Sequence, residues 1–208
     1  MPLEFTDEEK ILITLSLKKG YKFWDDKKLD KLKRKIKNHL RDIQRECCCY
    51  CCRSFDDEFN MVLDIEHIIP KSKIETEMFE ILNLAVSCKR CNMRIKGEKV
   101  DFIEGGFDEF KRGNQYYLPE KYKFLHPNLD SWDNHLAYNI KQLNRNKIVY
   151  YDILNDSSKG KYTKDYFELA KIQVNTFDEA QDATERKVPE SPAVARAFNS
   201  LLKRMFNL

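Results

Sequence analysis

Two cysteine pairs with the spacing C-x-x-C constrain this chain more than any other feature of its sequence. Five of its seven cysteines lie within six positions, in the segment RECCCYCCRSF of residues 45–55, and the other two are Cys88 and Cys91. A C-x-x-C pair presents two thiolates from a tight turn, and two such pairs suit a tetrahedral Zn²⁺ ion. The spacing therefore predicts a structural zinc site that closes the loop between the two pairs.

The register of the first pair is open from spacing alone. Cys48 and Cys51 have the required separation, and so do Cys49 and Cys52. In a reducing compartment, seven thiols favour metal binding over disulfides, and the odd number points the same way. A redox switch built on the crowded thiols is a competing hypothesis, which metal analysis would separate from a zinc site.

The composition is that of a globular intracellular protein. The chain has 208 residues, of which 42% are hydrophobic, enough for a buried core. It contains no apolar run near the roughly 18 residues that span a bilayer. The first residues, MPLEFTDEEK, lack the pattern of a secretory signal. We therefore expect a cytoplasmic protein with no membrane partner.

Positive charge is concentrated near the N-terminus. The net charge of the chain is only +3, but residues 18–45 hold 12 Lys or Arg against 4 Asp or Glu. Such a block can attract a polyanion such as nucleic acid. It can equally be the solvated face of a helix, and charge alone does not decide between the two.

The apolar pattern predicts a mixed α+β fold. A capping box of Thr6 and Glu9 begins a helix over residues 6–19, and an apolar stripe predicts a second helix over residues 25–46. Further predicted elements are a strand at 60–66, a helix at 75–86, a short helix after Cys91, a break at 105–106, a strand at 147–154, a turn at 155–161, and helices at 164–174 and 191–206.

The segment between the cysteine pairs resembles the HNH endonucleases, which have the ββα-metal nuclease fold. The matching motifs are, in chain order, C-x-Y-C at Cys48–Cys51, E-H-I-I-P at Glu66–Pro70, N-L at Asn83–Leu84, and C-x-x-C-N followed by K-G at Cys88–Gly97. Because many members of this family carry C-x-Y-C, the resemblance favours Cys48 and Cys51, with Cys88 and Cys91, as the zinc ligands. It covers about residues 46–98.

The resemblance also implies a catalytic set. His67 would be the general base, which suits an imidazole because its pKa lies near neutral pH. Glu66 and Asn92 would hold a catalytic Mg²⁺ or Mn²⁺ ion, and Asn83 would orient the loop and the base. Glu66 stands where this family more often has Asp or His, so Asp64 is an alternative ligand.

The implied substrate is nucleic acid, with DNA favoured. Four basic residues beside the motifs are expected to contact phosphates: Lys71, Lys73, Arg94 and Lys96. The alternative function, from a different class, is a non-catalytic zinc-containing module that binds nucleic acid or a protein partner.

A further segment, FLHPNLDSWDNHL, holds His126, Asp130 and His135, which could form a second metal site, and Trp132, which could stack on a base. It could equally be a structural corner with an X-Pro turn. The segment also resembles the HNH subunits of Septu-type and retron-type anti-phage systems, which implies an ATPase partner.

Together these features predict three regions. Residues 1–46 would be a helical region, residues 47–112 the HNH nuclease core, and residues 113–208 a mixed α/β extension packed on the core.

Overall fold

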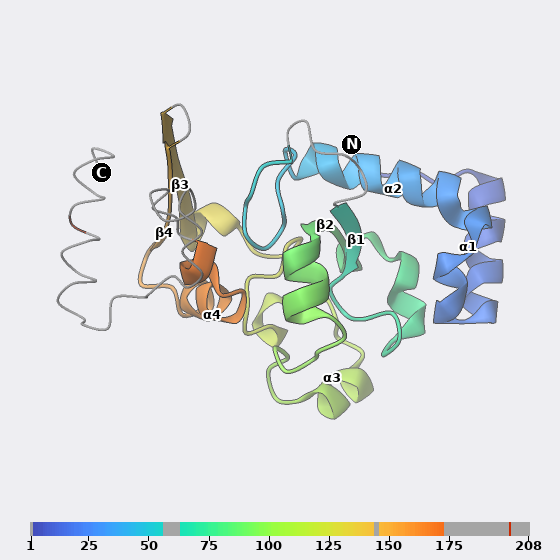
Figure 1. The fold of residues 1–208 in the computed structure, drawn as a ribbon. Helices are drawn as coiled ribbons and strands as arrows, with labels where there is room; N and C mark the ends of the chain where they lie inside the picture. Colours follow the sequence, from blue (N-terminus) through green and yellow to red (C-terminus); the bar gives the residue numbers. More distant parts are fainter. Residues whose placement is uncertain (1, 56–62, 144–145, 173–199, 201–208) are drawn as a thin grey trace. The chain divides into compact units, whose positions relative to one another are not determined.

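The computed structural model describes residues 2–55, 63–143, 146–172 and 200, and Figure 1 shows its fold. The chain divides into two compact units, Met1–Trp132 and Asp133–Leu208. The predicted division into regions 1–46, 47–112 and 113–208 follows motifs rather than contacts and stays a prediction. In the described part of the chain, no helix is long and apolar enough to cross a bilayer.

The first unit begins with two helices. Helix α1 (Asp7–Lys19) has the predicted capping box, in which the Glu9 N–H donates to Thr6 and Glu9 accepts from the Thr6 N–H, and it ends at Gly20 with φ 82°. Helix α2 (Asp30–Ile43) follows the 3₁₀ turns Tyr21–Asp25 and Lys27–Leu29. It is therefore shorter than the predicted helix over residues 25–46.

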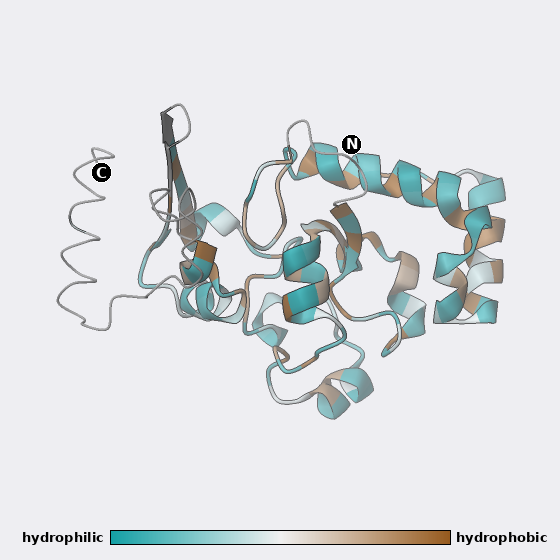
Figure 2. Ribbon diagram, viewed as in Figure 1, coloured by the Kyte–Doolittle hydropathy of each residue, from teal (hydrophilic) through white to brown (hydrophobic). Residues whose placement is uncertain are grey.

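The apolar stripe of the second helix buries most of its members. Leu29, Leu32, Ile36 and Leu40 are at most 2% exposed, whereas Ile43 at the end of α2 is 52% exposed. Hydrophilic residues cover the rest of this helix, as the largely teal α2 in Figure 2 shows. Burial of one face therefore leaves the lysine-rich faces of α2 toward solvent.

The centre of the first unit is a two-stranded antiparallel sheet. Strand β1 (Leu63–His67) pairs with β2 (Leu84–Cys88), with Asp64 opposite Ser87 and Glu66 opposite Ala85. The first residues of the predicted strand, 60–62, lie outside the described residues. A π-helix, Arg90–Lys96, follows β2 and ends at Gly97, where φ is 52°. Within the described residues, β1 pairs with β2 alone, so its other edge carries no strand.

The helix predicted over residues 75–86 is wrong. This segment forms the short 3₁₀ turns Glu75–Phe79 and Ile81–Asn83 and then β2. All five residues of β2 are buried, so the strand lacks the alternation of apolar and polar residues that marks a half-exposed strand. A short, fully buried strand and a buried helix are hard to distinguish by periodicity, and pairing with β1 decides the outcome.

The remainder of the first unit packs around aromatic side chains. Helix α3 (Phe107–Gly113), which the sequence did not predict, follows the expected break at Gly105–Gly106 and has Gly106 at its N-cap with φ 93°. Phe102, Tyr122 and Phe124 are at most 1% exposed, and the rings of Phe102 and Phe124 lie 4.3 Å apart. These contacts hold the two ends of the segment 102–124 together.

Residues 133–143 and 146–172 of the second unit form a β-hairpin followed by a helix. Strands β3 (Leu136–Leu143) and β4 (Asn146–Ile153) pair antiparallel, which confirms the strand predicted at 147–154 and adds β3. Helix α4 (Ser158–Tyr166) has Ser157 as its N-cap. Its first turn is polar, which explains why the turn predicted at 155–161 is wrong in its second half. The predicted helix at 164–174 overlaps only the end of α4 and the 3₁₀ turn Leu169–Ile172. The helix predicted at 191–206 lies outside the described residues except for Ser200.

Candidate active site

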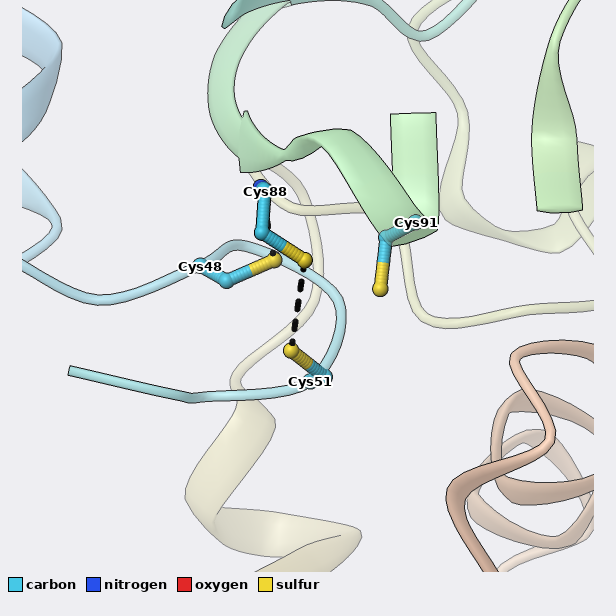
Figure 3. Close-up of side chains that lie close together, drawn as sticks. All are labelled: Cys48, Cys51, Cys88 and Cys91. Carbon is cyan, nitrogen blue, oxygen red and sulfur yellow. Dashed lines mark hydrogen bonds between the residues drawn. The ribbon is translucent and has the colours of Figure 1, made fainter. Parts of the chain in front are cut away.

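Four cysteines gather at one point in the first unit. The Sγ atoms of Cys48, Cys51, Cys88 and Cys91 all lie within 4.8 Å of one another, and all four residues are buried, as Figure 3 shows for their arrangement. The distance between the sulfurs of Cys51 and Cys88 is 3.8 Å. A tetrahedral Zn²⁺ with Zn–S bonds of about 2.3 Å requires sulfurs roughly 3.8 Å apart. The four thiols therefore fit zinc, and the geometry selects the register Cys48 and Cys51.

Local hydrogen bonds hold the turn of the first C-x-x-C pair, Cys48–Cys51, against the sheet. The Cys52 N–H donates to the Cys48 carbonyl at 2.9 Å, which closes the turn, and the Cys49 N–H donates to the Val86 carbonyl at 3.1 Å. The Cys88 N–H points at the Cys48 sulfur, at 3.4 Å. The cluster is thus formed where the turn of residues 48–52 meets the end of β2.

Hydrogen bonds among the four thiols shift their pKa values in opposite directions, lowering those of Cys48 and Cys88 and raising those of Cys51 and Cys91. Hydrogen bonds with Cys48 and Cys88, together with burial, raise the pKa of the Cys51 thiol well above its usual value. A bound Zn²⁺ would reverse this effect, because coordinating thiols are deprotonated. Cys47, Cys49 and Cys52 are partly exposed, form no disulfide and lie outside the four-cysteine cluster.

The Glu66 carboxylate lies next to the first C-x-x-C turn, Cys48–Cys51, and two side chains bind it. The Tyr50 hydroxyl donates to Glu66 Oε1 at 3.0 Å, and the Lys96 ammonium lies 2.7 Å from the same oxygen. Both Glu66 and Lys96 are 1% exposed. Burial raises the pKa of Glu66, and the Lys96 charge opposes that shift. Glu66 is therefore already neutralised by a side-chain cation.

This ion pair places Lys96 differently from the surface position that we expected for a phosphate contact. Its ammonium also donates to the His67 carbonyl at 2.8 Å and the Gly97 carbonyl at 3.3 Å. A charge this deeply buried needs such partners. Among the other three predicted phosphate contacts, Lys73 and Arg94 are exposed and Lys71 is half-buried.

His67, at the end of β1, is held in one orientation. Its Nε2 lies 3.1 Å from the Met78 carbonyl oxygen, and its ring meets the edge of Trp24 at a centroid distance of 4.5 Å. A carbonyl oxygen only accepts, so this contact assigns the proton to Nε2 and leaves Nδ1 as the acceptor. Burial, reinforced by the charge of Lys71, lowers the pKa of His67 to about 3. The imidazole is therefore neutral, as a general base requires.

We expect the low pKa of His67 to make folding stability depend on pH. The unfolded chain binds a proton at His67 near pH 6.5, whereas the folded chain does so only near pH 3. The unfolded state thus binds more protons between these values, so stability falls as the pH is lowered below 6.5. Urea unfolding at pH 7.5, 6.5 and 5.5 should show a steeper loss for wild type than for His67→Gln. The difference is at most about 1.4 kcal/mol per pH unit. Equal slopes for the two proteins would contradict this assignment.

Asn83 fixes the loop that joins the two strands. Its side chain accepts from the Ile69 N–H at 2.7 Å and donates to the carbonyls of Ile69 at 3.1 Å and Glu77 at 2.9 Å. The side chain is completely buried. These three bonds join both ends of the loop that contains Pro70 and supplies the Met78 carbonyl to His67. They are the contacts expected of a residue that orients the loop and the base.

Asp64 and Asn92 lie at a different place from Glu66. Both line an open cleft of about 850 Å³ between α2 and β1, together with Lys71. The Asp64 carboxylate pairs with the exposed Lys89 at 3.3 Å and is 28% exposed. Two of the predicted oxygen ligands, Asn92 and the alternative ligand Asp64, thus line this cleft, whereas Glu66 is buried with Lys96.

The segment near residue 130 has the contacts of a structural corner. The His126 N–H donates to the Asp130 carboxylate at 2.8 Å, and the Asn128 N–H donates to His126 Nδ1 at 3.2 Å. His135 belongs to the second unit, where its Nδ1 lies 2.6 Å from the Ser157 hydroxyl. In the part of the chain that the structure describes, the cysteine cluster is the one group of three or more His, Cys, Asp or Glu side chains close enough together to hold a metal.

Sequence reasoning missed two contacts of His67. Trp24 and the Met78 carbonyl both lie far from it along the chain, and no local pattern relates them to it. The helical spacing of Lys33 and Lys37 with Arg34 could have indicated a shared face of α2, but not that β1 lies opposite.

Residues 48–98 match the sequence model of the HNH endonuclease family. This segment contains both cysteine pairs, β1, β2 and the π-helix, so the chain contains an HNH domain. The predicted fold class is thereby confirmed: a mixture of helices and small sheets with an HNH domain and four cysteines positioned for a metal.

The chain is also similar to a Septu protein. It is 27% identical over 172 residues to the Septu protein PtuB of Bacillus thuringiensis, which is 82% of this chain and 52% of that protein. The chain thus spans about half the length of the curated relative that it matches. Both resemblances noted in the sequence, to the HNH endonucleases and to Septu proteins, are confirmed as similarities.

Proposed function

We propose that this chain is a metal-dependent endonuclease that hydrolyses phosphodiester bonds of nucleic acid, with DNA as the favoured substrate. The observation that carries the proposal is a neutral imidazole, His67, fixed by the Met78 carbonyl within an HNH domain. Hydrolysis of a phosphodiester needs a base for the attacking water, and a neutral histidine supplies one. Nδ1 of His67 is the atom that accepts this proton.

The residues around His67 position the base and the substrate. Asn83 holds the loop that carries the Met78 carbonyl, so it acts on the base through the loop. Lys71, Lys73 and Arg94 would contact phosphates, which gives affinity without sequence readout. Lys96 instead fixes Glu66 and the backbone of His67.

The oxygen donors near the cleft suit a hard divalent cation. Mg²⁺ typically uses one or two carboxylates, with waters and substrate phosphates completing its shell. A Mg²⁺ or Mn²⁺ ion held there would polarise the scissile phosphate and neutralise the leaving oxygen. The family resemblance implies Glu66 and Asn92 as its ligands. The contacts favour Asp64 with Asn92, because Glu66 would first have to lose its buried ion pair with Lys96.

The two carboxylates can be separated by substitution. We expect Asp64→Asn to raise the Mg²⁺ or Mn²⁺ concentration for half-maximal cleavage about tenfold or more, by analogy with other losses at metal sites. Glu66→Gln should leave that concentration unchanged but lower stability by about 3 kcal/mol, because Lys96 keeps a buried charge without its counterion. Cleavage of labelled DNA across a metal titration and urea unfolding measure the two effects.

The reverse result has an equally clear meaning. A shifted metal requirement in Glu66→Gln with normal stability would assign the metal to Glu66 and Asn92. No metal-dependent cleavage by wild type of single-stranded or duplex DNA or RNA, alone or with an ATPase partner, would argue against the proposed activity itself.

We further propose a role in anti-phage defence beside an ATPase partner. The support is the similarity to the Septu protein PtuB, together with the Septu-like segment around His126. A test is whether cleavage by the purified chain depends on, or is increased by, addition of the ATPase.

A further inference from the structure

One face of α2 forms a wall of the cleft that holds Asp64 and Asn92. The side chains of α2 that line it recur at helical spacing: Asp30, Lys33, Arg34, Lys37 and Asn38. Residues three, four, seven and eight positions apart lie on one side of a helix. The opposite wall is β1, which contributes Asp64 and Ile65 along the edge that carries no other strand within the described residues. The turn before α2, the loop after β1 and the π-helix complete the lining, so the cleft is built by several separate elements of the fold.

Cationic side chains outnumber acidic ones on this lining. The cations are Lys33, Arg34, Lys37, Lys71 and Lys89, and the acids are Asp25, Asp30 and Asp64. Two of the lysines are held in place by backbone carbonyls. The Lys33 ammonium donates to the Trp24 carbonyl at 3.2 Å, and the Lys37 ammonium donates to the Leu63 carbonyl at 2.6 Å. The Lys33 ammonium also pairs with the Asp30 carboxylate at 3.0 Å, so these lysines are held along the wall and Arg34 adds a further cation beside them.

The cleft leads to the candidate active site. Its lining includes Asn92 and Trp24, and Trp24 contacts the ring of His67. A phosphodiester chain bound along α2 would therefore pass beside the residues proposed to act on it. Its regularly spaced negative charges match a row of cations on one helix face, since phosphate contacts supply most of the affinity for nucleic acid.

We propose that the sugar–phosphate backbone of the substrate lies in this cleft, with Lys33 and Arg34 of α2 contacting its phosphates. This inference rests on the proposed function, but it adds a binding surface outside residues 48–98, the segment that matches the HNH family. The N-terminal basic block is thereby divided into a face that contacts the substrate and a face that is solvated.

A pair of matched double variants tests the proposal. Lys33→Ala/Arg34→Ala removes two charges from the cleft, and Lys28→Ala/Lys31→Ala removes two exposed charges from the same stretch that do not line it. Binding of a fluorescent DNA duplex is measured by anisotropy over a salt series without divalent metal, so that cleavage does not interfere. We expect at least about tenfold weaker binding for the cleft variant. Its plot of log K against log salt should be shallower by about 1.8, the value for two lost phosphate contacts. The control should stay within about threefold of wild type.

The other outcomes are distinguishable. Equal losses in the two double variants, or none in the cleft variant, would overturn the cleft proposal. Wild type that cleaves nucleic acid while the cleft variant binds normally overturns the cleft alone. If the cleft variant binds weakly and wild type binds but never cleaves, the cleft proposal is supported and the proposed nuclease activity is overturned. If Lys33→Ala disturbs the fold, the single variant Arg34→Glu replaces the double variant, because Arg34 is exposed. It must also weaken binding of the duplex for the proposal to stand. A single-stranded RNA probe shows whether the effect follows phosphates in general.

Discussion

Replacing Cys88 or Cys91 by alanine is expected to release the zinc and unfold the first unit. The four sulfurs lie within 4.8 Å of one another and join the turn of residues 48–52 to β2 and the π-helix. For structural zinc sites, metal binding contributes on the order of 10 kcal/mol to folding, comparable with the whole stability of a domain. Elemental analysis should find one zinc per wild-type chain and little in either variant, with loss of the cooperative thermal transition.

Cys52→Ala is the matched control, because Cys52 belongs to the same crowded segment but lies outside the cluster. It should retain zinc and the thermal transition of wild type. The result that contradicts the zinc assignment is a Cys88→Ala protein that keeps its metal and its fold. If the single variants Cys49→Ala and Cys52→Ala each lose the metal and Cys51→Ala keeps it, the zinc ligands of the first pair are Cys49 and Cys52 instead. A wild-type protein without metal whose cysteines form reversible disulfides would favour the redox hypothesis.

Features determined by neighbouring residues were predictable from the sequence. The capping box of α1 depends on Thr6 and Glu9, three positions apart, and it was predicted correctly. The buried stripe of α2 follows from the 3.6-residue period. The ligand motif also belongs here, because each C-x-x-C pair forms a local turn. In each case the residues that determine the structure lie within about one or two helical turns of one another.

Features determined by tertiary contacts were not predictable in the same way. The place of the Cys48–Cys51 turn against the sheet depends on Val86 of β2, whose carbonyl accepts from the Cys49 N–H. The helix predicted at 75–86 failed because β2 is buried on both faces. Glu66 was expected to hold a catalytic metal and Lys96 to contact a phosphate, yet the fold pairs these two residues, thirty positions apart, with each other. Spacing identifies which residues carry chemistry, but packing decides which of them reach the cleft.

Replacing His67 by alanine is expected to lower the rate of DNA cleavage by about 10²–10⁴-fold, the usual contribution of a general base. Binding of DNA should remain within about threefold of wild type, since the cleft cations are unchanged. His67→Gln fills more of the space beside Trp24 and should be equally inactive, which separates loss of the base from loss of packing. His39→Ala, on α2 and outside the cleft lining, is the control and should cleave like wild type. Product formation from labelled duplex and single strands in Mg²⁺ or Mn²⁺ measures the rate.

The activity assay also decides between the two classes of function. If wild type and His67→Ala bind DNA alike and neither cleaves it with any metal, the chain is a zinc-containing binding module, because binding alone requires no base. If wild type cleaves only when an ATPase partner is added, and His67→Ala does not cleave even then, the chain is a regulated nuclease subunit. Equal cleavage by wild type and His67→Ala would place the base elsewhere. The contact between Nε2 and the Met78 carbonyl makes the loss of cleavage the expected result, because it leaves the Nδ1 lone pair available to accept a proton.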